Sequence, residues 1–381
     1  MQSTMSVSIF SPEFNLMLSC CRVKPGRKEL ERREKALGGS IDEDLFFALL
    51  IRHRVLPLVY FNLKEESRIS GTLKDKLKQL AAANQLEALQ SMNMQFRLQK
   101  EFDQHAYKGF FIKGVTLSEQ YYGDAGLRHV MDIDCWVEQK AVEPIAHWLF
   151  KEGYNSVPDL SRLNTRQLAF VQKTDHDLQF FTEKPGQPKV IELHWKLRGP
   201  LGGFNLRPEV SMNEVDHFLY LCTHGTEHGW FRLKWLFDLP QIMDRVGFDW
   251  VQVRERAVVL DCLDHLEITM MVLESLLNEP IPDAIIDQLT QSKYANQLRY
   301  IHEAIASASV FNDNDANRLA YLKYMNTLSR KRINGTLILK YLTSHRDWEL
   351  LPLPSSLFFL YFPLRPFLIL WRRLFKMHGY S

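Results

Sequence analysis

Hydrophobic residues in the N-terminal part of the chain recur at the three- and four-residue spacing of amphipathic helices. The spacing predicts one helix that begins at the capping-box sequence Ser-Ile-Asp-Glu of residues 40–43 and ends near His53. It predicts a second helix over residues 56–63 and a third, much longer helix over residues 73–107. We therefore expect residues 1–108 to form a helical N-terminal region.

Short apolar and alternating segments replace the helical spacing after Gly109. A period of two residues is typical of strands. Four segments predict strands on this basis: residues 110–112, 130–137, 176–182 and 190–195. Helical spacing between them predicts helices over residues 116–122 and 141–151. Residues 109–200 are therefore predicted to hold a small mixed sheet with helices packed on it.

Helical spacing returns after Asn213 and continues to the end of the chain, so residues 201–381 are expected to form a helical C-terminal region. The predicted fold class is α+β, with a small mixed-sheet core between two helical regions. The most apolar segment, residues 350–364, is interrupted by prolines. It is shorter than the about 20 residues that a transmembrane helix needs. We expect it to be buried or to lie on the surface, with no transmembrane segment.

The composition narrows the class of protein. The 381 residues include 47 Lys and Arg against 45 Asp and Glu, a net charge of +2. So small an excess argues against a dedicated nucleic-acid binder, which carries a strongly basic surface. The five cysteines include no Cys-x-x-Cys pair, which indicates reduced thiols and a cytoplasmic protein.

Asp132 and Asp134 are the first candidates for chemistry. They lie two residues apart on a predicted strand, so they point to the same face, about 7 Å apart along the strand. Carboxylates together with substrate phosphates are the ligands that Mg²⁺ prefers, and the pair therefore suits a divalent metal. A solvated acidic strand face has the same pattern, and on this motif alone it is the simpler interpretation.

Further residues accompany the pair. Lys113 and Gly114 end the first predicted strand, Arg128 precedes the acidic strand, and Glu192 lies on the last strand. The order of strand, glycine turn, short helix, acidic strand and later acidic strand resembles the DNA polymerase beta-like nucleotidyltransferase fold. More narrowly, the segments FIKGVTLSEQYYGDAGLRHVMDIDCWV, VIELHWKL and LCTHGTEHGWFRLKWLFDL resemble the uncharacterised bacterial nucleotidyltransferase family found in polysaccharide and peptide natural-product gene clusters. The resemblance covers nearly the whole chain.

The resemblance implies phosphoryl-group transfer by two-metal catalysis. It implies Mg²⁺, or Mn²⁺, bound by three carboxylates that are also the expected catalytic residues: Asp132, Asp134 and Glu192. Many members of the fold hold the terminal phosphates with a Gly-Ser turn, which this chain replaces by Lys-Gly. Nucleotide binding is therefore expected from four other residues: Lys113, Gly114, Arg128 and His194. The expected partners are a nucleoside triphosphate, with ATP as the first choice, and a small-molecule, sugar or peptide acceptor.

Several alternatives stay open at this point. Lys113 also suits a solvated strand end, and Arg128 suits an ion pair with Asp124 or Asp132. His194 also suits an ordinary hydrogen-bonded position in a sheet. For the whole protein, the leading prediction is Mg²⁺-dependent transfer of a nucleoside monophosphate to a hydroxyl or phosphate. The alternatives are a catalytically idle nucleotide-binding module of the same fold and a phosphotransferase that moves the γ-phosphate.

The segment from His224 to His228 matches the H-x-x-E-H motif of inverted zinc proteases, in which the histidines would be zinc ligands and Glu227 the general base. That chemistry needs both histidines on one face of a rigid helix, and a glycine such as Gly225 weakens a helix by about 1 kcal/mol. The aromatic residues that follow suit packing instead. We predict that His224 and His228 contact the acceptor in its pocket and bind no zinc, with core or helix-capping roles as the open alternative.

Overall fold

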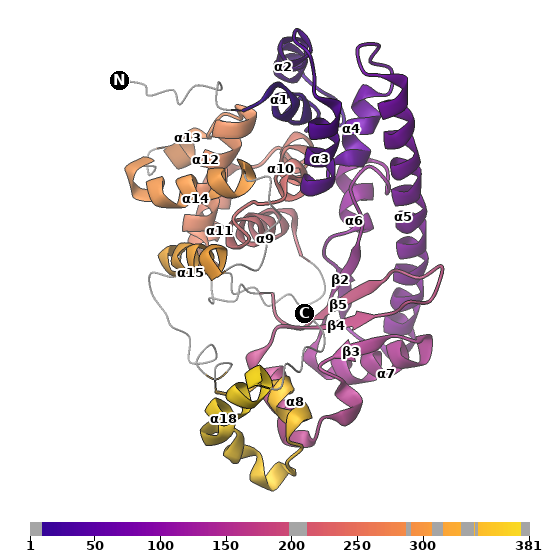
Figure 1. Ribbon diagram of the computed structural model, residues 1–381, viewed down its shortest axis with the longest axis vertical. Coiled ribbons are helices and arrows are strands. Elements are labelled where there is room, and N and C mark those ends of the chain that lie inside the picture. Colours follow the sequence, from indigo (N-terminus) through magenta and orange to yellow (C-terminus); the bar gives the residue numbers. More distant parts are fainter. Residues whose placement is uncertain are drawn as a thin grey trace.

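The computed structural model describes residues 10–197, 212–286, 291–306, 315–328, 339 and 342–374. The described residues form one five-stranded sheet, with helices before and after it in the chain. The prediction of an α+β fold is confirmed. Figure 1 shows the sheet beside the long helix α5 (Gly71–His105), with most of the C-terminal helices gathered on the opposite side of the molecule.

Five helices precede the sheet: α1 (Pro12–Leu18), α2 (Arg27–Leu37), α3 (Glu43–His53), α4 (Leu56–Leu63) and α5 (Gly71–His105). The helices predicted from the spacing are present, but the predicted capping box is wrong. The N-cap of α3 is Asp42, whose carboxylate accepts from the backbone N–H of Leu45 at 3.0 Å. Glu43 accepts instead from the backbone N–H and the hydroxyl of Ser70. The helix begins at Glu43 because the Asp42 side chain satisfies a free N–H of the first turn.

The sheet has five strands: β1 (Gly109–Phe111), β2 (Asp132–Val137), β3 (Asn155–Val157), β4 (Asp177–Phe181) and β5 (Val190–His194). They lie in the order β1-β2-β5-β4-β3, in which β2 and β5 are parallel and the other neighbours are antiparallel. The four predicted strands are present. The hydrophobic pattern does not predict β3, because its three residues are too few to show an alternation.

The two faces of the sheet differ in polarity. One face carries Ile133 and Ile191, which pack against residues of α5 and of α7 (Val142–Glu152) in an apolar cluster. The other face carries Asp134 of β2 directly opposite Glu192 of β5. The alternation of side chains along each strand therefore separates an apolar core from a polar face.

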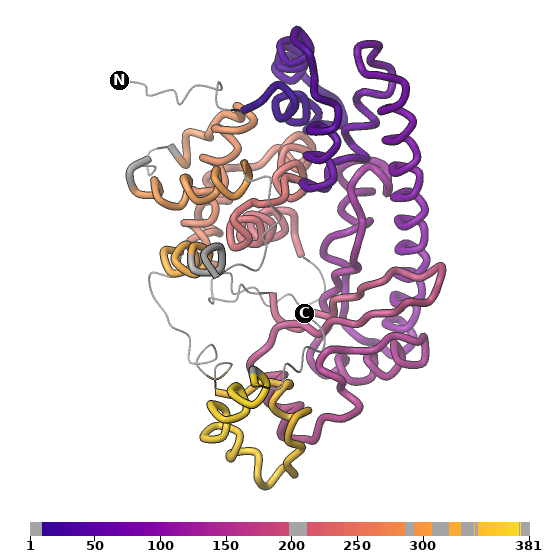
Figure 2. The backbone as a smooth tube through the Cα atoms, viewed as in Figure 1, coloured from indigo at the N-terminus to yellow at the C-terminus, as the bar shows by residue number. Residues whose placement is uncertain are grey.

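The C-terminal helices in the described part of the chain include α9 (Glu214–Glu227), α10 (Leu233–Val246), α11 (Trp250–Val259), α12 (Leu263–Leu277), α13 (Asp283–Ile286), α14 (Ala295–Ala306) and α15 (Asp315–Leu328). They share one apolar cluster with the N-terminal helices, in which Leu16 and Leu56 join Phe218 and Leu236. Figure 2 shows the indigo N-terminal helices next to the pink segment of α10. Two helical regions that are distant in sequence therefore bury a common core.

The last described helices form a small group with α8 (Thr165–Thr174): α17 (His345–Leu350), the 3₁₀ segment Ser355–Leu360 and α18 (Tyr361–Leu374). Trp348 and Tyr361 from this group join the apolar cluster of the sheet. Asp347 pairs with Arg365 at 2.5 Å and with Arg372 at 3.1 Å. A search of the described residues finds no helix with the length and apolarity needed to cross a membrane.

Candidate active site

The parallel pairing of β2 and β5 brings two acidic residues together. Asp134 stands opposite Glu192, and the next pair on the same face is Trp136 with His194. Asp134 is only 3% exposed. The alternative of a solvated acidic strand face is therefore wrong for Asp134, because neighbouring side chains cover its carboxylate.

Four polar side chains surround the two carboxylates. The ammonium of Lys113 donates to Asp134 Oδ1 at 3.2 Å. The ring nitrogen Nε2 of His194 lies 3.4 Å from Asp134 Oδ1 and 3.5 Å from Glu192 Oε2. Gln179 of β4 donates to Glu192 Oε1 at 3.0 Å, and the ring of Tyr220 on α9 lies 5.4 Å from the Lys113 ammonium. We call Asp134, Glu192, Lys113 and His194 the acidic cluster.

Opposite charges within the acidic cluster balance one another. Burial raises the pKa of Glu192 above its ordinary value. Burial also acts to raise the pKa of Asp134, but Lys113 and His194 outweigh it and hold that pKa well below its usual range. For His194, burial acts to lower the pKa, and the hydrogen bonds to Asp134 and Glu192 outweigh it and raise the pKa to about 9. Each buried charge therefore has a partner of opposite sign, as buried charges require.

The acidic cluster has the composition of a divalent-metal site. Ligand atoms of Asp134, Glu192 and His194 lie within 4.8 Å of one another. Carboxylate oxygens suit Mg²⁺ and Mn²⁺, and an imidazole is a better ligand for Mn²⁺ than for Mg²⁺. Asp132 lies outside this group of three, although it shares the strand face. The sequence prediction named Asp132, Asp134 and Glu192, so the structure groups two of these residues and adds His194.

The turn after β1 positions Lys113. Gly114 has a φ of +67°, and a Cβ at this position would lie 3.2 Å from the carbonyl oxygen of Asp132. Glycine suits the turn because it adopts this conformation without a steric penalty. Lys113 itself is 6% exposed, so the alternative of a solvated strand end is wrong.

Arg128 forms an ion pair that the sequence does not predict, while its role in nucleotide binding stays a prediction. Its guanidinium donates to both carboxylate oxygens of Asp238 on α10, at 2.8 Å and 3.0 Å. Tyr122 donates to the same carboxylate at 2.8 Å. Ion pairing with Asp124 or Asp132 is therefore wrong, because the buried Asp238 takes that role. Arg128 fixes the segment before β2 against α10, and two of its donors are already used.

A family model described as uncharacterised nucleotidyltransferase matches residues 39–278. The chain belongs to this family. The match confirms the resemblance found in the sequence and spans α3 to α12, with the whole acidic cluster. Comparisons with curated proteins and with solved structures give no match. The protein is accordingly a nucleotidyltransferase, an enzyme of the class that transfers nucleoside monophosphates from nucleoside triphosphates.

In this nucleotidyltransferase, His224 and His228 lie at the C-terminal end of α9. Their rings are 4.6 Å apart, and the rings lie 5.1 Å and 5.0 Å from that of Trp235. His224 lies near enough to the acidic cluster for the charge of Asp134 to act on it. A Cβ at Gly225 would come within 2.2 Å of the Trp230 ring, which explains a glycine inside this helix.

The zinc-protease motif has no counterpart in the described structure. The candidate metal groups among the described residues lie on the sheet, and neither of them contains His224, Glu227 or His228. Glu227 is 7% exposed and belongs to the helical core, where burial raises its pKa to about 8. Among the described residues, no third metal ligand accompanies His224 and His228. That the two histidines bind no zinc stays a prediction.

The sequence analysis missed several polar residues near Asp132. Arg54 follows α3, His129 precedes β2, and Arg232 and Lys234 lie at the start of α10. The charge of Asp132 acts on Arg54, Arg232 and Lys234. Arg232 and Lys234 stand within one of the segments that resemble the family, but nothing in their spacing points to Asp132. Their approach depends on how the helical regions pack against the sheet.

Proposed function

We propose that this nucleotidyltransferase uses a divalent metal, Mg²⁺ or Mn²⁺, to transfer a nucleoside monophosphate from a nucleoside triphosphate, with ATP as the expected donor. The proposed acceptor is a hydroxyl or phosphate of a small molecule, sugar or peptide. The observation that carries the proposal is the pairing of Asp134 with Glu192, beside His194 and Lys113, on the polar face of the sheet. Two carboxylates in register on adjacent strands are a suitable arrangement for binding a metal that also binds phosphates.

The proposed roles follow from position and charge. Asp134 and Glu192 would hold the metal, which supplies Lewis acidity toward the phosphate oxygens when it is bound. Asp132 is the proposed outer carboxylate on the same face, about 7 Å along the strand from Asp134. Lys113 carries a positive charge beside Asp134, where it would neutralise charge on the reacting phosphate. His194 would orient the carboxylates that it contacts.

The transfer itself balances without further reactants. The acceptor oxygen forms a bond to the α-phosphorus, and the bond between the α-phosphorus and its bridging oxygen to the β-phosphate breaks. Pyrophosphate leaves, and the acceptor hydroxyl gives up its proton. Glu192 is proposed to help take this proton, since its carboxylate stands opposite Asp134 on the same face of the sheet.

The acceptor is proposed to bind on the α9 side of the acidic cluster. His224 and His228 stand there with Trp235, and Tyr220 lies between His224 and Lys113. Aromatic and imidazole rings offer stacking and hydrogen bonds to a sugar or another polar acceptor. A cytoplasmic location is part of the proposal, since all five cysteines are free and buried.

Labelled nucleotide tests the proposal. With Mg²⁺ or Mn²⁺, label on the α-phosphate of ATP should move to the acceptor, and label on the γ-phosphate should appear in pyrophosphate. Asp134→Asn should abolish the transfer, whereas Asp103→Asn, at an exposed position on α5, should leave it unchanged. Transfer of the γ-label to the acceptor would replace the proposal with phosphotransfer, and movement of neither label would favour a catalytically idle module.

A further inference from the structure

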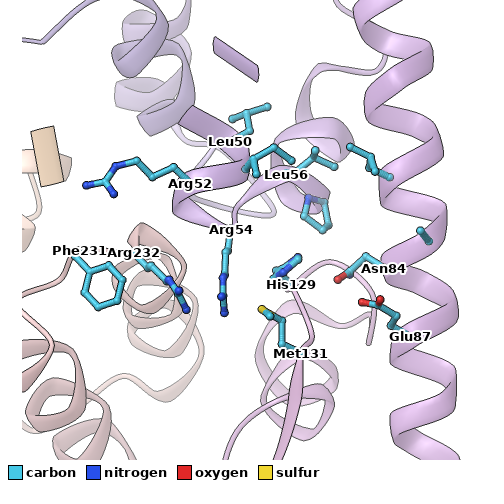
Figure 3. A pocket seen from close by; sticks show the side chains of 14 residues that line it. Leu50, Arg52, Arg54, Leu56, Asn84, Glu87, His129, Met131, Phe231 and Arg232 are labelled. Atoms are coloured by element: carbon cyan, nitrogen blue, oxygen red, sulfur yellow. The ribbon is translucent and has the colours of Figure 1, made fainter. Parts of the chain in front are cut away.

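A cavity with a mostly apolar lining and several basic side chains lies beside the segment that leads into β2. This cavity of about 420 Å³ is bounded by α3, α4 and α5 on one side and by the segments of His129 and Arg232 on the other. Figure 3 shows the Arg54 side chain pointing into this cavity between Arg232 and His129, whereas the guanidinium of Arg52 points away. Arg52 donates to the backbone carbonyl of Ala304. We call Arg54, His129 and Arg232, which line this cavity, the cationic pocket. Lys234 does not line the cavity but follows Arg232 by two residues in α10.

The positive charges of the cationic pocket lack matching carboxylates. Burial and the charge of Arg232 together lower the pKa of Arg54 to about 10, against the opposing effect of Asp132. Burial likewise lowers the pKa of Lys234 to about 7, with Arg128 and Arg54 adding to the effect. The negative charge of Asp132 acts to raise the pKa of both Arg54 and Lys234. Glu87 of α5 is a further carboxylate in the lining of the cavity, at an exposed position. Asp132 acts on all three basic side chains, Asp238 acts on Lys234 as well, and neither carboxylate forms an ion pair with them among the described residues.

The placement of these side chains is unfavourable for the protein alone. Arg54 has a φ of +57°, in the left-handed region that non-glycine residues rarely adopt. Arg232 is the N-cap of α10 and Lys234 lies in its first turn, where the helix dipole repels positive charge. Lys234 is 5% exposed. Within the described part of the chain, its ammonium makes no hydrogen bond or ion pair. An anion bound among these groups would remove the repulsion.

The position of Asp132 connects the cationic pocket to the acidic cluster. The charge of this residue acts on Arg54, Arg232 and Lys234, and also on Lys113 of the acidic cluster. Lys113 and Arg128, the cations expected to hold phosphate, are already paired with Asp134 and Asp238. Among the described residues, Arg54, Arg232 and Lys234 form no such ion pair, and the charge of Asp132 acts on all three.

We propose that the cationic pocket binds a phosphate group of a substrate, either the polyphosphate of the nucleotide or a phosphate carried by the acceptor. The identity of the substrate rests on the proposed function. Phosphate suits the pocket because two guanidinium groups can each bind two of its oxygens and because it carries more than one negative charge. The same pocket would favour a monocarboxylate much less, since it offers a single charge.

Binding of inorganic tripolyphosphate in the absence of metal tests the proposal. Isothermal titration calorimetry would compare the wild-type protein with the Arg54→Asn and Arg232→Gln variants. Each substitution should weaken binding by about ten- to hundredfold. Asn is chosen at Arg54 because it tolerates a positive φ better than most residues. Arg27→Gln, which removes an equal charge from an exposed ion pair with Glu31, should leave binding unchanged.

Two further measurements complete the test. Arg54→Lys should restore part of the affinity, since it returns the charge, and thermal unfolding would verify that each variant is folded. Competition with ATP then distinguishes the sources of phosphate: displacement of ATP by tripolyphosphate assigns the pocket to the nucleotide. Simultaneous binding of ATP and glucose 1-phosphate, with only the latter sensitive to Arg54→Asn, assigns it to the acceptor.

Equal tripolyphosphate affinity in all folded variants, or no binding at all, would overturn the cationic pocket as a phosphate site. This outcome is independent of the proposed function, because the measurement uses no metal and no turnover. Conversely, a failure of the labelled transfer would leave the phosphate-binding result as it stands.

Discussion

The acidic cluster and the cationic pocket both hold buried charged groups beside Asp132, but their charges are balanced differently. In the acidic cluster, Lys113 and His194 contact the carboxylate of Asp134. Around the cationic pocket, Arg54, Arg232 and the neighbouring Lys234 feel the charge of Asp132 but form no ion pair with it among the described residues. Balanced charges stabilise their own arrangement, whereas unbalanced charges favour a ligand of opposite sign.

The pKa values of His194 and Lys234 show how the two regions differ in charge balance. His194 and Lys234 are 6% and 5% exposed, so burial opposes the charge on both. For His194, contacts with two carboxylates outweigh burial and raise the pKa to about 9. For Lys234, neighbouring Arg128 and Arg54 add to the effect of burial, and the pKa falls to about 7. The two carboxylates therefore reverse the effect of burial on the pKa of His194, whereas the neighbours of Lys234 leave the effect of burial in place.

The largest expected effect follows from removing the carboxylate of Asp134 from the acidic cluster. Asp134→Asn should reduce transfer activity by about 100-fold or more and destabilise the protein by about 3 kcal/mol, because Lys113 is left buried without its ion-pair partner. Activity assays and urea unfolding measure the two effects. The double variant Lys113→Met/Asp134→Asn should recover stability without recovering activity. Equal stability of the single variant and the wild type would show that the charges are not coupled.

A metal titration compares the acidic cluster with the H-x-x-E-H segment. Glu192→Gln should weaken Mn²⁺ binding by about tenfold or more, since it removes one charged ligand. His224→Ala should leave Mn²⁺ affinity unchanged, because His224 belongs to no candidate metal group among the described residues. Electron paramagnetic resonance of free Mn²⁺ measures both. Stoichiometric zinc in the purified protein that disappears in His224→Ala would contradict this assignment.

The pH dependence of protein stability tests the buried charge of Lys234. The pKa of Lys234 is lowered from 10.5 to about 7 on folding by burial, Arg128 and Arg54, with Asp132 and Asp238 opposing. Between these values the unfolded chain binds the extra proton, so the stability of the wild type should rise with pH from about 7 toward 10.5. Lys234→Met should remove about 1–2 kcal/mol of this rise and stabilise the protein at pH 6.

The control for this experiment is Lys140→Met, because the Lys140 side chain is 72% exposed. Urea midpoints of both variants across the same pH range give the comparison. A pH profile of Lys234→Met that matches the wild type would mean that the buried charge of Lys234 does not strain the free protein.

The smallest expected effect concerns Glu227, a buried acid whose pKa rises from 4.5 to about 8 through burial. Here the folded protein holds the proton longer than the unfolded chain, so stability should fall as pH rises from about 4.5 to 8. Glu227→Gln should reduce this fall by about 1 kcal/mol, with catalysis unchanged. Loss of activity in Glu227→Gln with the fold intact would instead return a chemical role to the H-x-x-E-H segment.

Local patterns in the sequence were sufficient for most of the elements and for part of the site. Strand alternation places Asp132 and Asp134 on one face of β2, because the period of a strand is two residues. The helix α8 escaped the hydrophobic pattern, although Asn164 and Gln167 form a capping box there that would have located its start. The division into residues 1–108, 109–200 and 201–381 stays a prediction.

The residue types of the acidic cluster and the alternation that exposes them on one face were determined by the sequence itself. Which of them meet was decided only by the tertiary structure, because the register of β2 against β5 sets Asp134 opposite Glu192. The cationic pocket is wholly a tertiary feature, since Arg54, His129 and Arg232 come from three distant segments. Sequence periodicity reports the face that a side chain occupies, whereas long-range packing determines which charges share a buried volume and therefore their pKa values.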